Sequence, residues 1–135
     1  MDAAGTALGA VSLGLSILDG VIEYCQKWKD RDKDINDLQE FARDLYNILD
    51  ELRPRLTGLH SISLATQLES CITRCENRLQ KLLDRSFEFE QTSKPLKNLW
   101  RKAVYPFKKE SVFGLREALR SFQDNLNLAL NLWNL

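Results

Sequence analysis

The sequence has few of the residues that most enzymes and metal sites use. It contains one histidine, His60, and three cysteines, Cys25, Cys71 and Cys75. A zinc site would combine His60 with Cys71 and Cys75, whose four-residue spacing is not the close pair of a structural zinc site. A hydrolase would need His60 beside a thiol, and no nucleophile motif or phosphate-binding loop is present. We therefore predict no catalytic residue, no metal, no cofactor and no enzyme activity.

The chain also lacks an excess of charge and a basic N-terminus. Its 19 basic and 19 acidic side chains cancel at neutral pH, which argues against nucleic acid as a dedicated partner. The charges are unevenly distributed, because residues 1–51 have a net charge of −6 and residues 52–135 have a net charge of +6. An odd number of cysteines favours a reducing, cytoplasmic setting. Since no basic residue precedes Lys27, a secretory signal peptide is not expected.

Signals for β-strands are missing as well. Apolar residues repeat at helical spacing nearly throughout, with no Asn-Gly or Asp-Gly turn between alternating runs. A first helix is predicted over residues 3–28, where apolar side chains form more than one stripe. A second helix runs from about Ile35 until Pro54 and then Thr57–Gly58 end it. Without internal repeats or linkers, residues 1–135 are predicted to form one domain.

The second half of the chain is predicted to hold two long helices with a short one between them. The first of these starts near Ser63 or at a capping box formed by residues 66–69, and ends around Phe87. Prolines bound the short helix at residues 95 and 106. The last helix begins near Ser111 and reaches the final residue without a stop signal, which predicts that the natural chain continues.

The longest uncharged stretch lies at the N-terminus, over residues 3–18. Small residues recur there at four-residue spacing, as in Gly5 with Gly9, so they form rows that let another backbone approach closely. Glycine inside a helix costs roughly 1 kcal/mol relative to alanine, so helicity alone does not explain them. The segment either packs against helices of an assembly or a bilayer, or is a buried N-terminal helix with tight neighbours. Acidic residues follow this short run, so a permanent transmembrane anchor is not predicted.

A second feature is a basic and aromatic segment over residues 91–109, which contains no acidic side chain. Aromatic rings beside lysines suit an anionic membrane surface, where each basic residue adds about 1 kcal/mol of binding. The alternatives are a solvated helix face whose aromatic residues belong to the core, and, as a weaker option, nucleic acid. The residues predicted to bind anionic lipid are Lys94, Lys97, Trp100, Arg101, Lys102, Tyr105, Lys108 and Lys109.

Three stretches together resemble a known family. They are residues 21–35 (VIEYCQKWKDRDKDI), residues 105–112 (YPFKKESV) and the Leu-x-Leu-Ala-Leu run at residues 126–130. They resemble the HeLo-like N-terminal domains of fungal NOD-like receptors of the NACHT and ankyrin type. A tryptophan often precedes the proline in that family, where this chain has Tyr105. The resemblance implies a bundle similar to that of the mixed-lineage kinase domain-like pseudokinase, so we predict an all-α four-helix bundle with an additional short helix before the last long helix.

The resemblance also implies a function and partners. In several relatives, a sensor or amyloid-signalling part oligomerises, and the bundle then exposes an apolar N-terminal helix that disturbs the plasma membrane and causes regulated cell death. For this chain, the implied partners are anionic membrane lipids, further copies of itself, and C-terminal receptor or amyloid-signalling parts. The domain would move from the cytoplasm to the plasma membrane on activation. The membrane-inserting or helix-packing residues would be Gly5, Leu8, Gly9, Val11, Leu13, Gly14, Leu15, Ile17, Leu18 and Gly20.

Other N-terminal domains of this group act only as interaction modules, so a non-lytic oligomerisation module stays open as the alternative. The two functions differ in whether the first helix leaves the bundle or stays buried. If it leaves, its small-residue rows mediate helix contacts within the lipid. Replacing Gly9 and Gly14 by leucine is then expected to abolish membrane toxicity more than it perturbs folding.

Overall fold

Four long helices account for nearly all of the chain that the computed structural model describes, namely residues 2–28, 33–87 and 109–133. The helices are α1 (Ala3–Trp28), α2 (Lys33–Leu56), α3 (Ile62–Phe87) and α5 (Lys109–Leu132). These segments contain no strand, so the predicted all-α fold with four long helices is confirmed. The short helix predicted between Pro95 and Pro106 lies outside the described residues.

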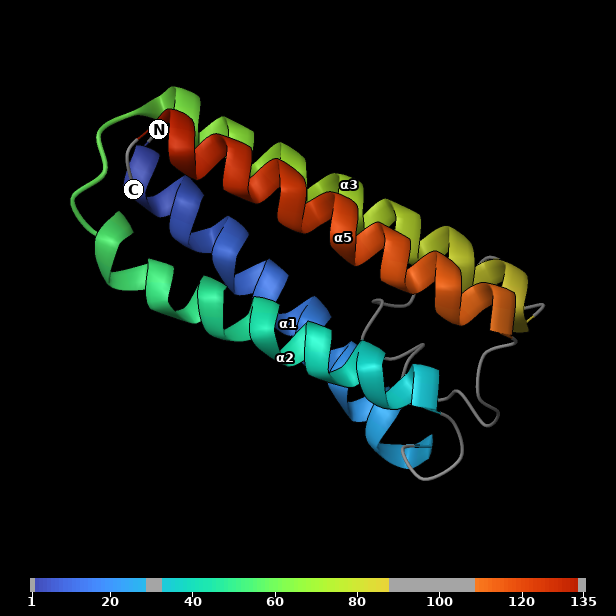
Figure 1. Ribbon diagram of the computed structural model, residues 1–135. Helices are drawn as coiled ribbons and strands as arrows, with labels where there is room; N and C mark the ends of the chain where they lie inside the picture. The colour runs from blue at the N-terminus through green and yellow to red at the C-terminus, as the bar shows by residue number, and fades with distance from the viewer. Residues whose placement is uncertain (1, 29–32, 88–108, 134–135) are drawn as a thin grey trace.

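The helices form a bundle in which successive helices run in opposite directions (Figure 1). α1 packs against α2 and α3, α3 packs against α5, and α5 closes the ring by touching α2. α1 and α5 are therefore diagonal to each other, as are α2 and α3. The α2–α3 connection, residues 57–61, crosses the end of the bundle where α1 begins and α5 ends (Figure 1).

Hydrogen bonds to side chains define several helix ends. The Asp2 carboxylate accepts a hydrogen bond from the Ala4 N–H at 3.1 Å, which caps α1. The predicted end of α2 at Thr57–Gly58 is confirmed, since the helix ends at Leu56; Pro54 lies within its last turn. The Thr57 hydroxyl donates to the Pro54 carbonyl at 2.9 Å, which satisfies a backbone acceptor that the end of the helix leaves open.

The start of α3 differs from the predicted capping box. Ser61 is the cap, because its Oγ accepts a hydrogen bond from the Leu64 N–H at 3.2 Å. Thr66 already lies inside the helix, and its hydroxyl donates to the Ile62 carbonyl one turn earlier at 2.8 Å. The predicted start near Ser63 is therefore confirmed, since α3 begins at Ile62, and the alternative of a capping box at Thr66 is wrong because Ser61 supplies the capping oxygen.

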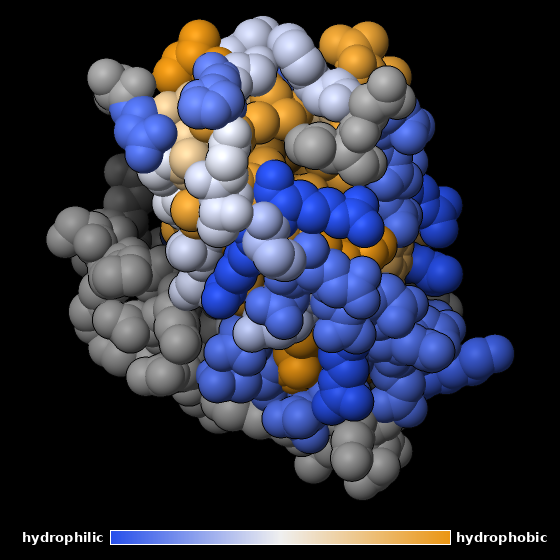
Figure 2. Space-filling view, turned by 90° about the vertical axis from the view of Figure 1, so that its left-hand side faces the viewer, coloured by the Kyte–Doolittle hydropathy of each residue, from blue (hydrophilic) through white to orange (hydrophobic). Residues whose placement is uncertain are grey.

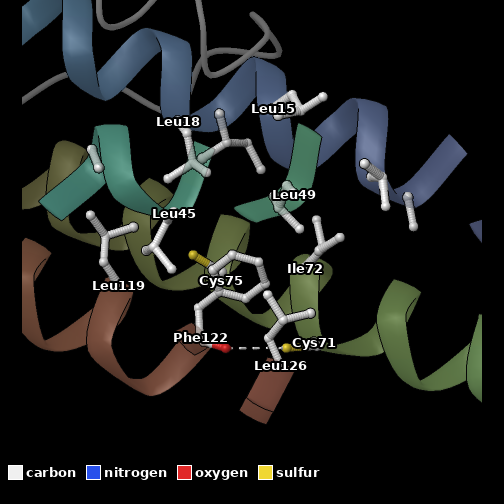
Figure 3. Packing of buried hydrophobic residues seen from close by; sticks show 14 of the residues in the cluster. Leu15, Leu18, Leu45, Leu49, Cys71, Ile72, Cys75, Leu119, Phe122 and Leu126 are labelled. Atoms are coloured by element: carbon white, nitrogen blue, oxygen red, sulfur yellow. Dashed lines mark hydrogen bonds between the residues drawn. The ribbon is translucent and has the colours of Figure 1, made fainter. Parts of the chain in front are cut away.

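The core is built from one apolar stripe of each helix. One stripe of α1 points inward, and its residues Val11, Leu15 and Leu18 are each at most 4% exposed. Burial of such side chains, at about 25 cal/mol per Å² of apolar surface, is the main stabilisation of a bundle. Figure 3 shows this stripe meeting residues of the other helices: Leu45 and Leu49 of α2, Cys71, Ile72 and Cys75 of α3, and Leu119, Phe122 and Leu126 of α5.

Gly14 lies where α1 approaches both α2 and α3. A Cβ atom at this position would lie 2.9 Å from Cδ1 of Leu49 and 3.4 Å from Cδ1 of Ile72. At Gly9 the corresponding Cβ would have nothing within 4 Å. Leucine at Gly14 would therefore overpack the core, so in the double change only Gly9 can affect membrane toxicity without also perturbing folding. Spacing along a helix shows which residues share a face, but not which face turns inward.

Candidate functional site

Over residues 3–18, the side of α1 that faces solvent carries no charge. Gly5, Gly9 and Ser12 are exposed and Leu13 is 39% exposed, and we call these four residues the outer face of α1. No charged side chain occurs anywhere from residue 3 to residue 18. Leu13 is exposed although Ile17, one turn further along the same side of the helix, is buried.

The neighbouring helices turn charged faces to solvent. Figure 2 looks at the end of the bundle where α1 begins, and shows hydrophobic and near-neutral residues in the upper part and hydrophilic residues over the lower right. A helix that only had to face water would carry polar groups on its outer side. The outer face of α1 is therefore the candidate functional surface. The charged residues exposed on its two neighbours include Glu40, Arg43, Asp44 and Asp50 of α2, and Glu69, Arg74, Arg78 and Lys81 of α3.

The structure divides the predicted membrane-inserting residues between two environments. Three of them, Gly5, Gly9 and Leu13, are exposed, and Leu8 is half-buried. The remaining six are buried in the bundle: Val11, Gly14, Leu15, Ile17, Leu18 and Gly20. Most of the predicted set therefore cannot reach lipid unless the bundle opens.

The predicted lipid-binding residues fall almost entirely outside the described part of the chain. This holds for Lys94, Lys97, Trp100, Arg101, Lys102, Tyr105 and Lys108. Lys109 is the first residue of α5. The prediction that this segment contacts anionic lipid stays a prediction.

α1 has the length and composition of a membrane-spanning helix. The segment Ala3–Gln26 contains 24 residues and is apolar enough to cross a bilayer, although half of it is buried inside the bundle. At 1.5 Å per residue, such a helix is about 36 Å long, against a hydrocarbon core of about 30 Å. The core helix of a soluble protein passes the same test. The length of α1 is thus compatible with both the bundle and a bilayer.

A groove of about 420 Å³ lies between α3 and α5. Its α5 wall carries two leucines that are largely exposed, Leu128 at 68% and Leu132 at 70%. Near one end, the indole Nε1 of Trp133 donates a hydrogen bond to Oε1 of Gln67 at 3.1 Å, which joins the two helices. Sequence reasoning missed this groove, because the leucines belong to an apolar run. The only signal in the sequence is that helical spacing puts these two leucines off the face that Leu119, Phe122 and Leu126 share.

The three thiols are part of the core. Burial raises the pKa of Cys71 to about 11 and that of Cys25 and Cys75 to about 12, so these thiols stay protonated at neutral pH. Cys71 donates a hydrogen bond to the Phe122 carbonyl at 3.7 Å, linking α3 to α5 (Figure 3). His60 is exposed in the α2–α3 connection, and no metal-ligating cluster occurs among the residues that the structure describes. The three buried thiols therefore serve as small core residues, and the exposed His60 does not lie in the core with them.

The fold defines a helical-bundle domain, in which the first helix keeps an uncharged face toward solvent over residues 3–18. A family model described as "pigment biosynthesis cluster protein PigL N-terminal" matches residues 2–135. The chain therefore belongs to this family, a domain of fungal type. Comparison with curated proteins and with solved structures finds no match. The resemblance to HeLo-like domains stays a prediction.

Proposed function

We propose that this domain is a membrane-targeting effector without enzyme activity, whose α1 enters the bilayer once several copies gather. The observation that supports the proposal best is the uncharged outer face of α1, on a helix long enough to span the hydrocarbon core. The proposed outcome is permeabilisation of the plasma membrane and cell death in a fungal immune-type receptor. The proposed partners are anionic lipids, further copies of the chain, and receptor or amyloid-signalling parts of a longer protein.

α1 cannot leave the bundle for water. Each large side chain that it exposes would cost about 1.5–3 kcal/mol, so the total is on the order of 10 kcal/mol. This matches the whole stability of a typical domain, about 5–15 kcal/mol. Lipid offsets the loss because it solvates the same apolar side chains. Residues 3–18 add no charge to desolvate, and the acidic Asp19 and Glu23 lie toward the far end of the segment. The large side chains that α1 buries are Val11, Leu15, Ile17, Leu18, Val21 and Tyr24.

When several copies gather on an anionic surface, the equilibrium between the closed bundle and the membrane-inserted state shifts toward insertion. A ligand shifts an equilibrium only by its differential affinity for the two states. Anionic lipid contributes through the basic residues predicted to bind it, and neighbouring copies contribute helix contacts at Gly5 and Gly9. These glycines offer exposed backbone on the outer face, which is the geometry that helix association in lipid uses.

A charge on the outer face tests the proposal. Ser12→Glu places a carboxylate near the middle of α1, where an acidic residue costs about 2.5–3.5 kcal/mol in the bilayer centre. Because Ser12 is exposed in the bundle, folding should be preserved while insertion falls roughly 70- to 400-fold. The matched control is Ser63→Glu, the same change at an exposed site in the first turn of α3.

The assay is dye release from vesicles of phosphatidylcholine with and without phosphatidylserine, with the protein clustered on nickel lipid through a C-terminal tag. The parent chain and S63E are expected to release dye from the anionic vesicles, and S12E is not. Circular dichroism confirms that all three chains are folded. Equal release by S12E and the parent would refute the role of α1, and an intact vesicle under every condition would refute the proposed function.

A second candidate function, a non-lytic interaction module, is favoured by the groove between α3 and α5. Leu128 and Leu132 are exposed there without any change in the bundle, so this groove could contact a protein partner while α1 stays buried. The vesicle experiment separates the two functions. For the module, clustered protein leaves both kinds of vesicle intact and α1 keeps its bundle contacts.

A further inference from the structure

Three of the four sides of the bundle are joined by specific contacts. Between α1 and α2, Nε2 of the buried Gln39 donates a hydrogen bond to the Ile22 carbonyl at 3.4 Å. Between α1 and α3, Gly14 brings the backbone close to Ile72. α3 and α5 are joined by the hydrogen bond of the Cys71 thiol to the Phe122 carbonyl. Each of these pairs also shares extensive packing.

The fourth side, between α2 and α5, is the weakest of the four. Among the packed pairs of described helices, this pair has the fewest contacts. A gap of about 100 Å³ lies between these helices, lined by Ile48, Glu51, Leu52 and Arg55 of α2 and by Leu130 of α5. We call this side the α2–α5 seam. Glu51 and Arg55 are exposed, so water and ions reach the seam from outside.

Local opening of a protein takes place where few apolar contacts are buried and solvent already reaches the interface. We propose that the bundle opens along the α2–α5 seam, as two intact helical hairpins, α1–α2 and α3–α5, that stay joined through the α1–α3 contact. Opening then exposes the inward side chains of Figure 3 to lipid while α1 is still attached to both of its neighbours. The consequence for lipid rests on the proposed function, whereas the route of opening does not.

This route changes the order of events at the membrane. Release of α1 as the first step would break the α1–α2 and α1–α3 sides together, which are two of the three well-packed sides. Opening of the seam breaks one weak side and presents core residues such as Leu45, Leu119 and Leu126. The hairpins therefore separate before α1 leaves its neighbours.

Paired spin labels on the full chain measure the route directly. Asn47→Cys with Asn127→Cys reports on the distance between α2 and α5, and Ser12→Cys with Asp50→Cys reports on the distance between α1 and α2. All four sites are exposed. Labelling at neutral pH selects them, because burial raises the pKa of each native thiol to about 11 or higher.

The seam is first loosened in solution, without lipid. Leu130→Ala removes a half-buried side chain from the seam, and Leu128→Ala is the matched control because Leu128 is exposed on the same helix. L130A is expected to broaden the α2–α5 distance distribution toward longer values, whereas L128A leaves it unchanged. In both variants the α1–α2 distance should stay as in the parent. Earlier or larger separation of α1 from α2 would overturn the proposal.

Anionic vesicles of phosphatidylserine and phosphatidylcholine provide the second arm. The α2–α5 distance is expected to grow by about one helix diameter, roughly 10 Å, while the α1–α2 distance changes less. Dye release without growth of the α2–α5 distance would overturn the seam and leave the proposed function standing. If L130A opens the seam in solution but the protein releases no dye from vesicles, the proposed function is overturned and the route of opening stands.

Discussion

Replacing Gly14 by alanine tests whether α1 is held in the bundle by close approach of its backbone. The matched change is Gly9→Ala, which adds the same methyl group to the same helix at an exposed site. In both variants the higher helix propensity of alanine contributes about 0.5–1 kcal/mol to the stability of the folded state. Only the environment of the new Cβ atom distinguishes the two variants.

The magnitude of the difference follows from the contacts at each site. At Gly9 a Cβ has nothing within 4 Å, so the full gain remains. At Gly14 it would lie 2.9 Å from Cδ1 of Leu49, a residue that is 0% exposed. A void of about 10 Å³, room for roughly one water-sized sphere, lies beside Gly14, but it is lined by Ile72 and not by Leu49, so it gives Leu49 no space into which to move. Overpacking of this kind costs about 1–3 kcal/mol.

We therefore expect Gly9→Ala to stabilise the domain by about 0.5–1 kcal/mol, and Gly14→Ala to be neutral or destabilising by up to about 2 kcal/mol. Urea unfolding followed by circular dichroism measures both, and the melting temperatures should differ by about 3–5 °C for each kcal/mol. Shortening Leu49 to valine should recover part of the cost of G14A, since the two sites are coupled. If G14A were as stable as G9A, close approach at this position would not hold α1 in place.

Two further predictions concern the α3 cap and the buried thiols. Ser61→Ala removes the oxygen that accepts the backbone N–H at the start of α3, so urea unfolding should show a loss of about 0.5–2 kcal/mol, whereas Ser63→Ala should stay within about 0.5 kcal/mol; equal losses would contradict the assigned cap. Burial raises the pKa of the Cys75 thiol from 9.0 to about 12, so its neutral form stabilises the folded state fully below pH 9, and this contribution is lost as the pH rises from 9 toward 12. The unfolding free energy of Cys75→Ala should therefore fall less steeply above pH 9 than that of the parent; parallel slopes would contradict a buried neutral thiol.

Helical periodicity carried enough information to place the long helices. α1 covers the predicted residues 3–28, and α5 begins two residues before the predicted Ser111. The errors occur at ends where neighbouring polar groups compete for the same backbone atoms. Ser61, and not Thr66, caps the start of α3, and α2 includes Pro54 in its last turn. The start of a helix depends on which side-chain oxygen accepts the hydrogen bond of a free backbone N–H, and the spacing of apolar residues carries no information about this choice.

The candidate site was only partly predictable. The uncharged run at residues 3–18 is visible in the sequence, and the structure places it in α1; a role for it stays a prediction. The exposure of Leu128 follows from helical spacing, which puts it off the face shared by Leu119, Phe122 and Leu126, whereas the groove beside it depends on how α3 packs against α5. Gly5, Gly9 and Gly14 look alike in the sequence, yet only Gly14 lies against neighbouring helices.

Periodicity and charge, which are local properties of the chain, were sufficient to establish an all-helical fold, the approximate extent of its long helices and the uncharged run at residues 3–18. The tertiary structure alone decided which side of α1 faces solvent, that Gly14 serves the core, and that the α2–α5 seam is the weakest side of the bundle. The physical reason is that each of these features depends on the distance between residues far apart in the chain. Helical spacing specifies a stripe, whereas the helices packed around it determine how tightly that stripe is held.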